Sequence, residues 1–265
     1  MSDAILLSVD EGLARLTLNR PARLNAFNAD LAHAWRDATA EATSRADVRA
    51  ILIDASGPAF CAGGDVIDMA TTMGSGAEIT ALAEVINAGI RSLTESSVPV
   101  VAAAHGTTAG GGLGILLSSD YAVVGSRSRL GSLYANIGLT PDLSVSAQLA
   151  RAVGQRRALQ LVLQDRLLSA QEAQDWGLVA EAVAGEDAAS EAALVRARGE
   201  EIARFWLAGA AEAYGHAKRL VRSQPERTFV EQLSEEARSI GAAMQTPDAQ
   251  ARIRAFAAAS AKKAG

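Results

Sequence analysis

The apolar positions in the first part of the chain come in short runs separated by polar turns, a pattern typical of strands. The runs lie at residues 4–9, 13–19, 50–55, 98–104 and 121–125. Asp10-Glu11-Gly12 separates the first two runs, so they predict a hairpin. The other three are almost wholly apolar, which favours buried strands.

Between these runs, apolar residues recur every three or four positions, which predicts helices. We expect one helix over residues 28–44, capped by Asn28, another over 77–93, and a third from a glycine cluster to residue 119. Ser169-Ala-Gln-Glu172 is a capping box, and Gly177 fits the position just beyond that helix. Strand and helix alternate up to about residue 184, which predicts an α/β core.

The remainder of the chain has helical spacing almost throughout, with helices expected at 186–208, 210–223, 226–244 and 248–261. The change in composition predicts two regions, residues 1–200 and residues 201–265. The second region carries more apolar residues than one small core can absorb, which predicts contacts between subunits. These residues are Ile202, Phe205, Trp206, Phe229, Leu233 and Ile240.

Charge and composition exclude several classes of function. The 265 residues carry a net charge of −5, so no basic surface is expected for nucleic acid or for an anionic membrane. No apolar run approaches the roughly 18 residues of a membrane span, and the N-terminus lacks the pattern of a signal peptide. Cys61 is the single cysteine, so no intrachain disulfide can form and the cytoplasm is the expected compartment. The three histidines have no metal-ligand spacing, so no metal is expected.

Two glycine-rich turns are candidates for chemistry. Residues 60–65 follow the strand at 50–55, and residues 110–114 follow the strand at 98–104. Glycine lets a backbone approach a ligand closely, and two N–H groups that converge on one oxygen would form an oxyanion hole. Neither turn fits the dinucleotide-binding motif. The alternative, that each is only a turn, stays open at this point.

Five motifs in order make the pattern specific. They are NRPARLNAF at 19–27, PAFCAGGDV at 58–66, VPVVAAAHGTTAGGGLG at 98–114, IGLTPD at 137–142 and LLSAQEAQDWGLV at 167–179. Over roughly residues 5–265 the chain resembles the crotonase superfamily, also called the enoyl-CoA hydratase/isomerase family. The resemblance implies an α/β fold with a ββα spiral core, a helical C-terminal trimerisation region, and a homotrimer or hexamer. It also implies an acyl-CoA thioester substrate, with coenzyme A as part of that substrate and no separate cofactor.

The resemblance assigns candidate roles by position. The backbone N–H groups of Gly64 and Gly111 would form the oxyanion hole around the thioester oxygen. Arg23, Ala62 and Asp65 would contact coenzyme A, although Arg23 can also be interpreted as a solvated loop arginine.

Two positions depart from the pattern of typical hydratases, which carry a pair of glutamates that activate water. Here those positions hold Gly114 and Tyr134. Glycine offers no base, and a phenol with a pKa of about 10 activates water poorly. Asp142 instead matches a catalytic aspartate of dienoyl-CoA isomerases, epoxyphenylacetyl-CoA isomerases and 4-chlorobenzoyl-CoA dehalogenases, the branches that the motifs resemble most.

We therefore expect an isomerase in which Asp142 transfers protons and Tyr134 lines the acyl pocket, with ordinary hydratase activity disfavoured. One alternative is an aryl-CoA dehalogenase or hydrolase with Asp142 as nucleophile, although Asn87 occupies the position of the dehalogenase histidine. Another is a catalytically degenerate relative that binds CoA esters or a macromolecule. Asp142 could also be a helix cap, and Asp68 or Glu84 a second acid. Cys61 is expected to be a small buried packing residue.

Overall fold

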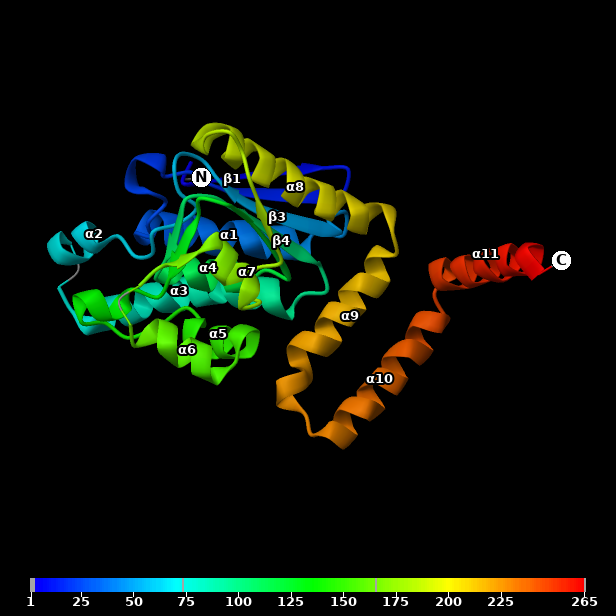
Figure 1. Ribbon diagram of the computed structural model, residues 1–265. Coiled ribbons are helices and arrows are strands. Elements are labelled where there is room, and N and C mark those ends of the chain that lie inside the picture. The colour runs from blue at the N-terminus through cyan, green and yellow to red at the C-terminus, as the bar shows by residue number, and fades with distance from the viewer. Residues whose placement is uncertain (1–2, 73, 165, 265) are drawn as a thin grey trace.

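The computed structural model describes residues 3–72, 74–164 and 166–264 (Figure 1). Its larger sheet has the strand order β1-β2-β3-β4-β6-β9, and a smaller sheet has the order β5-β7-β8. The strands of the larger sheet are β1 (Ile5–Asp10), β2 (Leu13–Leu18), β3 (Ala50–Ala55), β4 (Val100–Ala104), β6 (Tyr121–Gly125) and β9 (Glu181–Val183). Those of the smaller sheet are β5 (Thr107–Ala109), β7 (Arg129–Gly131) and β8 (Leu168–Ser169).

The predicted hairpin is confirmed, since β1 and β2 are antiparallel and Ile5 lies opposite Leu18. From β2 onward the larger sheet is parallel, as an α/β core requires. The smaller sheet and β9 were not predicted, because their strands have only two or three residues.

Helices cover both faces of the larger sheet (Figure 1). Because successive side chains of a strand point to opposite faces, Ile51 and Ile53 of β3 join the core that contains α1 (Ala29–Ser44) and α3 (Gly76–Glu95). Leu52 points the other way and packs with Val195 of α8 (Ala188–Ala208). The sheet is therefore buried on both sides, which explains why β3 is buried along its whole length.

Two predicted helix starts, at Asn28 and Ser169, are confirmed by their capping bonds. Asn28 Oδ1 accepts a 3.1 Å bond from Leu31 N at the start of α1. Ser169 and Glu172 form the capping box of α7 (Ala170–Asp175), which Gly177 follows with φ at 76°. The helices α2 (Val66–Thr71), α5 (Val145–Val153) and α6 (Gln155–Val162) were not predicted.

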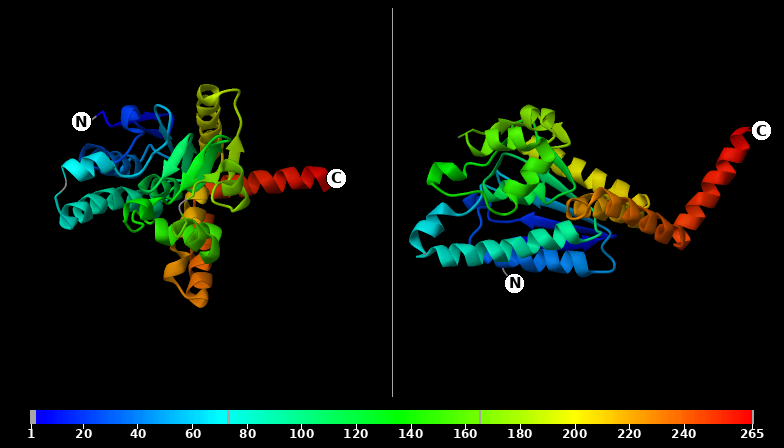
Figure 2. Two further views of the ribbon diagram at one scale, coloured as in Figure 1. Left: turned by 60° about the vertical axis from the view of Figure 1, so that its left-hand side comes forward. Right: turned by 90° about the horizontal axis from the view of Figure 1, so that it is seen from below.

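The C-terminal helices extend away from the sheets (Figures 1 and 2). They are α9 (Ala211–Ser223), α10 (Phe229–Met244) and α11 (Pro247–Ala264). Residue 200 lies within α8, and the division of the chain at that point stays a prediction. Two of the apolar residues expected at subunit contacts, Ile202 and Trp206, are partly buried and pack against the sheet of their own chain. By contrast, Phe229 and Ile240 are 75% and 74% exposed.

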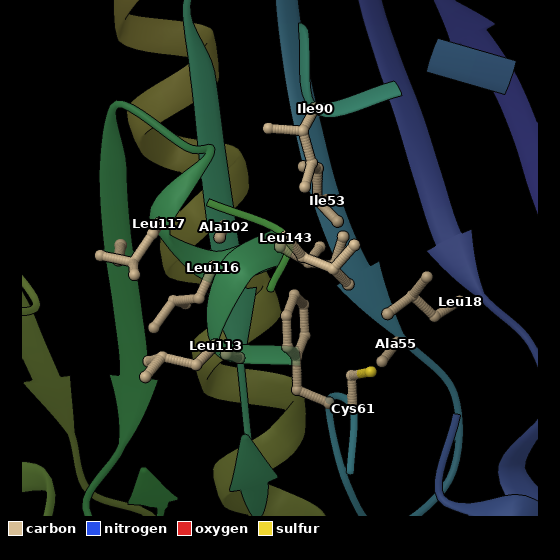
Figure 3. Packing of buried hydrophobic residues seen from close by; sticks show 14 of the residues in the cluster. Leu18, Ile53, Ala55, Cys61, Ile90, Ala102, Leu113, Leu116, Leu117 and Leu143 are labelled. Carbon is tan, nitrogen blue, oxygen red and sulfur yellow. The ribbon is translucent and has the colours of Figure 1, made fainter. Parts of the chain in front are cut away.

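The glycine turns lie at the ends of strands. The first lies between β3 and α2, whereas the second follows the short strand β5 rather than β4 and opens α4 (Gly111–Leu117). The α4 helix is part of the main core, where its residues Leu113 and Leu116 belong to the same cluster as Ile53 and Leu143 (Figure 3). Among the described helices, none has the length and apolar character needed to cross a membrane.

Candidate active site

A pocket of about 480 Å³ opens between α3, the two glycine turns and the segment 132–143. Four of the residues predicted to act in chemistry or in the oxyanion hole line it: Gly64, Gly111, Tyr134 and Asp142. The remaining lining is mainly apolar, with Phe27, Val66, Met69, Ile79, Leu82, Ile86, Ile137, Leu139 and Leu143. The pocket thus has an apolar wall and a small number of convergent polar groups, which is typical of a site for an organic ligand.

The two glycine turns touch each other at the base of the pocket. A Cβ on Gly63 would lie 3.3 Å from the Gly111 nitrogen and 3.0 Å from the Ala109 carbonyl oxygen. Gly63 has φ at 104° and Gly110 has φ at 52°, backbone conformations that glycine adopts without a steric penalty. Glycine at these positions therefore permits the close approach of the two turns.

Both predicted oxyanion donors have unpaired N–H groups. Phe27 forms a parallel bridge with Gly64, in which Phe27 N bonds to Gly63 O at 2.7 Å and Asp65 N bonds to Phe27 O at 2.9 Å. That pattern directs the Gly64 N–H away from Phe27, and Gly111 is the first residue of α4, where a helix has no internal acceptor. Within the described part of the chain neither N–H has an acceptor, so both can bind a ligand oxygen.

Tyr134 and Asp142 are hydrogen-bonded to each other. The Tyr134 hydroxyl donates a 2.5 Å bond to Asp142 Oδ1. Asp142 is an exposed residue on the pocket wall, while neighbouring protein atoms partly desolvate its carboxyl group. This desolvation raises the pKa of Asp142, against the opposing effect of the Tyr134 bond. Burial, followed by the Asp142 charge, raises the pKa of Tyr134 well above its usual range, so the phenol stays protonated as the donor.

The backbone is strained on both sides of this pair. Leu133 has φ at 52°, Leu143 at 46° and Ser144 at 66°, all in the left-handed region that non-glycine residues rarely adopt. Such strain persists only where the surrounding structure enforces it, and it concentrates at functional sites.

Asp142 is not the cap of the helix that follows it. The α5 helix starts at Val145 with Ser144 as its capping residue, and no side chain makes a capping bond there. Only the backbone oxygen of Asp142 accepts from Val145 N, at 2.9 Å, while the side chain bonds to Tyr134. The helix-cap interpretation is therefore wrong.

A family model described as enoyl-CoA hydratase/isomerase matches residues 8–262. The chain belongs to this family. It is 33% identical over 252 residues to a probable enoyl-CoA hydratase of Rhodobacter capsulatus, covering 95% of this chain and 94% of the relative. A 1,2-epoxyphenylacetyl-CoA isomerase of Escherichia coli is 30% identical, and the match covers 88% of this chain and 87% of the relative. A 4-chlorobenzoyl coenzyme A dehalogenase-2 of Arthrobacter sp is also 30% identical, and the match covers 93% of this chain and 87% of the relative.

The fold agrees with that of solved family members. A putative enoyl-CoA hydratase/isomerase from Mycobacterium abscessus superposes with a TM-score of 0.86 at 29% identity and covers 96% of each chain. The crotonase-like α/β fold is thereby confirmed. The chain is an acyl-CoA-processing member of the enoyl-CoA hydratase/isomerase family, whose named relatives carry out several different reactions.

Gly114 marks the clearest difference from a hydratase site. A Cβ at this position would lie 2.3 Å from the Leu143 carbonyl oxygen and 2.9 Å from Leu143 Cβ. Leu143 is itself 4% exposed and belongs to the main core (Figure 3). The space that a glutamate at 114 would need is therefore filled by backbone.

The three residues predicted to contact coenzyme A have different surroundings. Ala62 lines the pocket. Asp65 is 4% exposed and does not line it; its carboxylate caps α2 and accepts from Arg23 Nη2 at 2.6 Å and Arg20 Nη2 at 3.3 Å. The Arg23 guanidinium holds the pKa of Asp65 below its usual range. Arg23 keeps 40% of its side chain exposed, so it can still reach a ligand.

The candidate second acids separate in space. Glu84 lines the pocket from α3, while Asp68 of α2 does not. Asn87 is also absent from the pocket lining. Cys61 is fully buried, which raises the pKa of its thiol to about 12 and agrees with a packing residue. Of the described residues, no group of three His, Cys, Asp or Glu is placed to hold a metal ion.

Two further pocket residues belong to no pattern that sequence analysis could identify. The Met69 thioether lies over Gly64, since a Cβ on Gly64 would come 2.3 Å from Met69 Cε. Ser132 lines the pocket two residues before Tyr134, and its hydroxyl has no partner within the described residues. Neither belongs to a recognisable motif, so only the fold reveals them.

Proposed function

We propose that this protein isomerises an enoyl-type CoA thioester through an enolate, with Asp142 as the acid–base group. The observation that supports this most directly is the single pocket that contains the Asp142 carboxyl and the two unpaired N–H groups of Gly64 and Gly111. Those N–H groups would hydrogen-bond the thioester oxygen and stabilise the charge that develops there.

The reaction needs no external reactant. The Asp142 carboxylate removes a proton from a carbon of the acyl group, and the electron pair moves into the thioester as an enolate. The protonated Asp142 returns that proton to another carbon, and the double bond is displaced. Tyr134 donates to Asp142 and orients it. A carboxyl whose pKa lies above its ordinary value is better matched to such proton transfer.

Water addition is disfavoured by the same geometry. It would require a carboxylate to hold and activate the water, and position 114 has neither a side chain nor space for one. Tyr134 occupies the other position as a protonated phenol. Hydratases are nevertheless named among the relatives, so hydration belongs in the assay.

A dehalogenase or hydrolase is the second candidate, because a 4-chlorobenzoyl coenzyme A dehalogenase-2 is 30% identical. In that reaction Asp142 would attack a ring carbon directly. Asn87, at the position of the dehalogenase histidine, lies outside the pocket lining, which favours the isomerase. A degenerate relative that only binds CoA esters is the third outcome that the assay separates.

The deciding experiment is a panel of enoyl-, dienoyl-, epoxyphenylacetyl- and halobenzoyl-CoA esters, with products identified by NMR. We expect a shifted double bond in an enoyl or dienoyl ester. Halide release alone would replace this proposal with the dehalogenase, and binding without any turnover would replace it with the degenerate relative.

We further propose a homotrimer, or a hexamer of paired trimers, built on the C-terminal helices. Phe229, Ile240 and Phe256 of α10 and α11 are 75%, 74% and 76% exposed on helices that extend from the sheets (Figures 1 and 2). Exposed apolar side chains of this kind mark contact surfaces.

Arg23, whose guanidinium is held by Asp65, and Ala62 would contact coenzyme A. The cytoplasm remains the expected location.

A further inference from the structure

Three buried hydroxyl groups have no hydrogen-bond partner among the described residues. They are Thr108 Oγ1, Ser128 Oγ and Ser132 Oγ, and all lie on or directly beside strands β5 and β7. A buried hydroxyl without a partner loses its hydration and gains nothing in return, so each such group calls for an explanation. Of the three, Ser132 is the one that lines the active-site pocket.

The position of Ser132 follows from the pairing of the two strands. Ala109 of β5 is paired with Gly131 of β7, and Gly110 N donates to Gly131 O at 3.1 Å. Ser132 therefore lies beside Gly110, whose added Cβ would come 3.7 Å from the Ser132 carbonyl oxygen. It precedes Tyr134 by two residues along the chain. Ser132 thus lies beside the glycine turn that carries Gly111 and lines the same pocket as the Tyr134–Asp142 pair.

We propose that the Ser132 hydroxyl donates a hydrogen bond to an oxygen of the acyl group, as a third polar contact beside Gly64 and Gly111. The inference rests on the proposed function, because it needs an acyl-CoA ester in this pocket. The accepting oxygen belongs either to the thioester or to a substituent on the acyl chain. Without a ligand the hydroxyl has no partner among the described residues; in the complex the acyl oxygen would accept from it.

This arrangement predicts that activity and stability respond in opposite ways. Ser132→Ala removes an unsatisfied buried group, so the Tm of the free protein should stay constant or rise. The same change removes a contact to a substrate oxygen, so kcat/KM should fall about tenfold to a hundredfold, as for a hydrogen bond to a charged acceptor. A hydroxyl with a purely structural role would give the reverse result for Tm.

The matched control is Ser128→Ala. It removes the same group, equally buried and unpartnered, from the same strand region but outside the pocket. We expect its Tm to behave as that of Ser132→Ala, with kcat/KM within about twofold of wild type. Ser132→Thr, which keeps a hydroxyl, should recover part of the activity.

The measurements are thermal unfolding, kcat and KM on the ester that the wild type converts, and calorimetric affinity for hexanoyl-CoA, a saturated ester that cannot isomerise. A fall in kcat with a plain enoyl ester identifies the thioester oxygen as acceptor, whereas an effect confined to oxygenated acyl groups identifies a substituent. If Ser132→Ala matches wild type in turnover and affinity, or loses activity together with Tm, the inference is wrong and the proposed function stands. If the wild type neither binds nor converts any ester, both fail.

Discussion

The Tyr134 hydroxyl and Asp142 Oδ1 are joined by a 2.5 Å hydrogen bond that spans eight positions of the sequence. It holds an acid with a raised pKa against a phenol that remains protonated. The bond orients the carboxyl group of Asp142 within the pocket.

Asp142→Asn should abolish isomerisation while CoA-ester affinity stays near wild type. Asparagine keeps the size of the side chain but cannot accept a proton, and loss of a general base typically costs about 10²- to 10⁴-fold in rate. The measurement pairs kcat on the converted ester with calorimetric affinity for hexanoyl-CoA. Asp68→Asn, which changes an acid outside the pocket, should leave kcat unchanged. Full activity of Asp142→Asn on every ester of the panel would refute this mechanism.

The pH dependence follows from the raised pKa of Asp142. The base must be ionised, so kcat/KM should fall as the pH decreases through a pKa above that of an ordinary aspartate. The free energy of unfolding changes with pH in the opposite direction to the activity. A carboxyl whose pKa is raised in the folded state stabilises the fold at a pH below its unfolded pKa. That contribution is lost as the pH rises through the folded pKa. Asp142→Asn should therefore gain Tm relative to wild type at pH 7 but not at pH 3. An unchanged difference across this range would contradict the assignment.

Gly111→Pro should reduce turnover by at least two orders of magnitude, about the cost of one oxyanion donor. Proline lacks the N–H but is tolerated at the first position of a helix, which Gly111 occupies. Gly111→Ala is the matched control, because its Cβ meets the same Leu143 Cδ1 atom, 2.7 Å away, while the N–H is kept. Equal activity of both variants would exclude this N–H from the mechanism.

Gly114→Ala should destabilise the fold by about 1–3 kcal/mol, as expected when a close-packed core is overfilled. The added Cβ meets the Leu143 backbone, which cannot rotate away. For a chain of this size the Tm should fall about 2–4 °C for each kcal/mol. Gly241→Ala is the control, because nothing lies within 4 Å of its Cβ in the α10 helix, and its Tm should stay constant or rise. A Gly114→Ala variant as stable as wild type would show that Leu143 yields easily.

Assembly is tested by light scattering at micromolar concentration, where we expect a trimer or hexamer. Phe229→Asp combined with Ile240→Asp places charges on two exposed apolar positions of α10 and should dissociate the assembly. Leu6→Asp, at an exposed apolar position on β1, should not. A monomeric wild type would count decisively against the proposed interface.

The sequence predicted the long elements well because their periodicity is strong. The ends of α1, β3 and β6 agree with the expectation to within one residue. The small sheet was missed because strands of two or three residues carry no period. At the site, motif positions identified Gly64, Gly111, Tyr134 and Asp142, which the fold does bring into one pocket. The packing of Leu143 against Gly114, and the unsatisfied Ser132, depend on tertiary contacts that no local pattern encodes.

The Leu143 backbone beside Gly114 also limits the paths by which such a site can diverge. A single substitution at position 114 cannot introduce a carboxylate, because the segment that leads from Asp142 into α5 must first be re-routed. Re-routing that segment would in turn displace Asp142, which it carries. Exchange between hydration and the proposed isomerisation is therefore an epistatic problem. The loop has to move before a carboxylate at position 114 becomes useful, and that movement costs the carboxylate of Asp142. An intermediate in which neither carboxylate is in place would have no activity for selection to preserve.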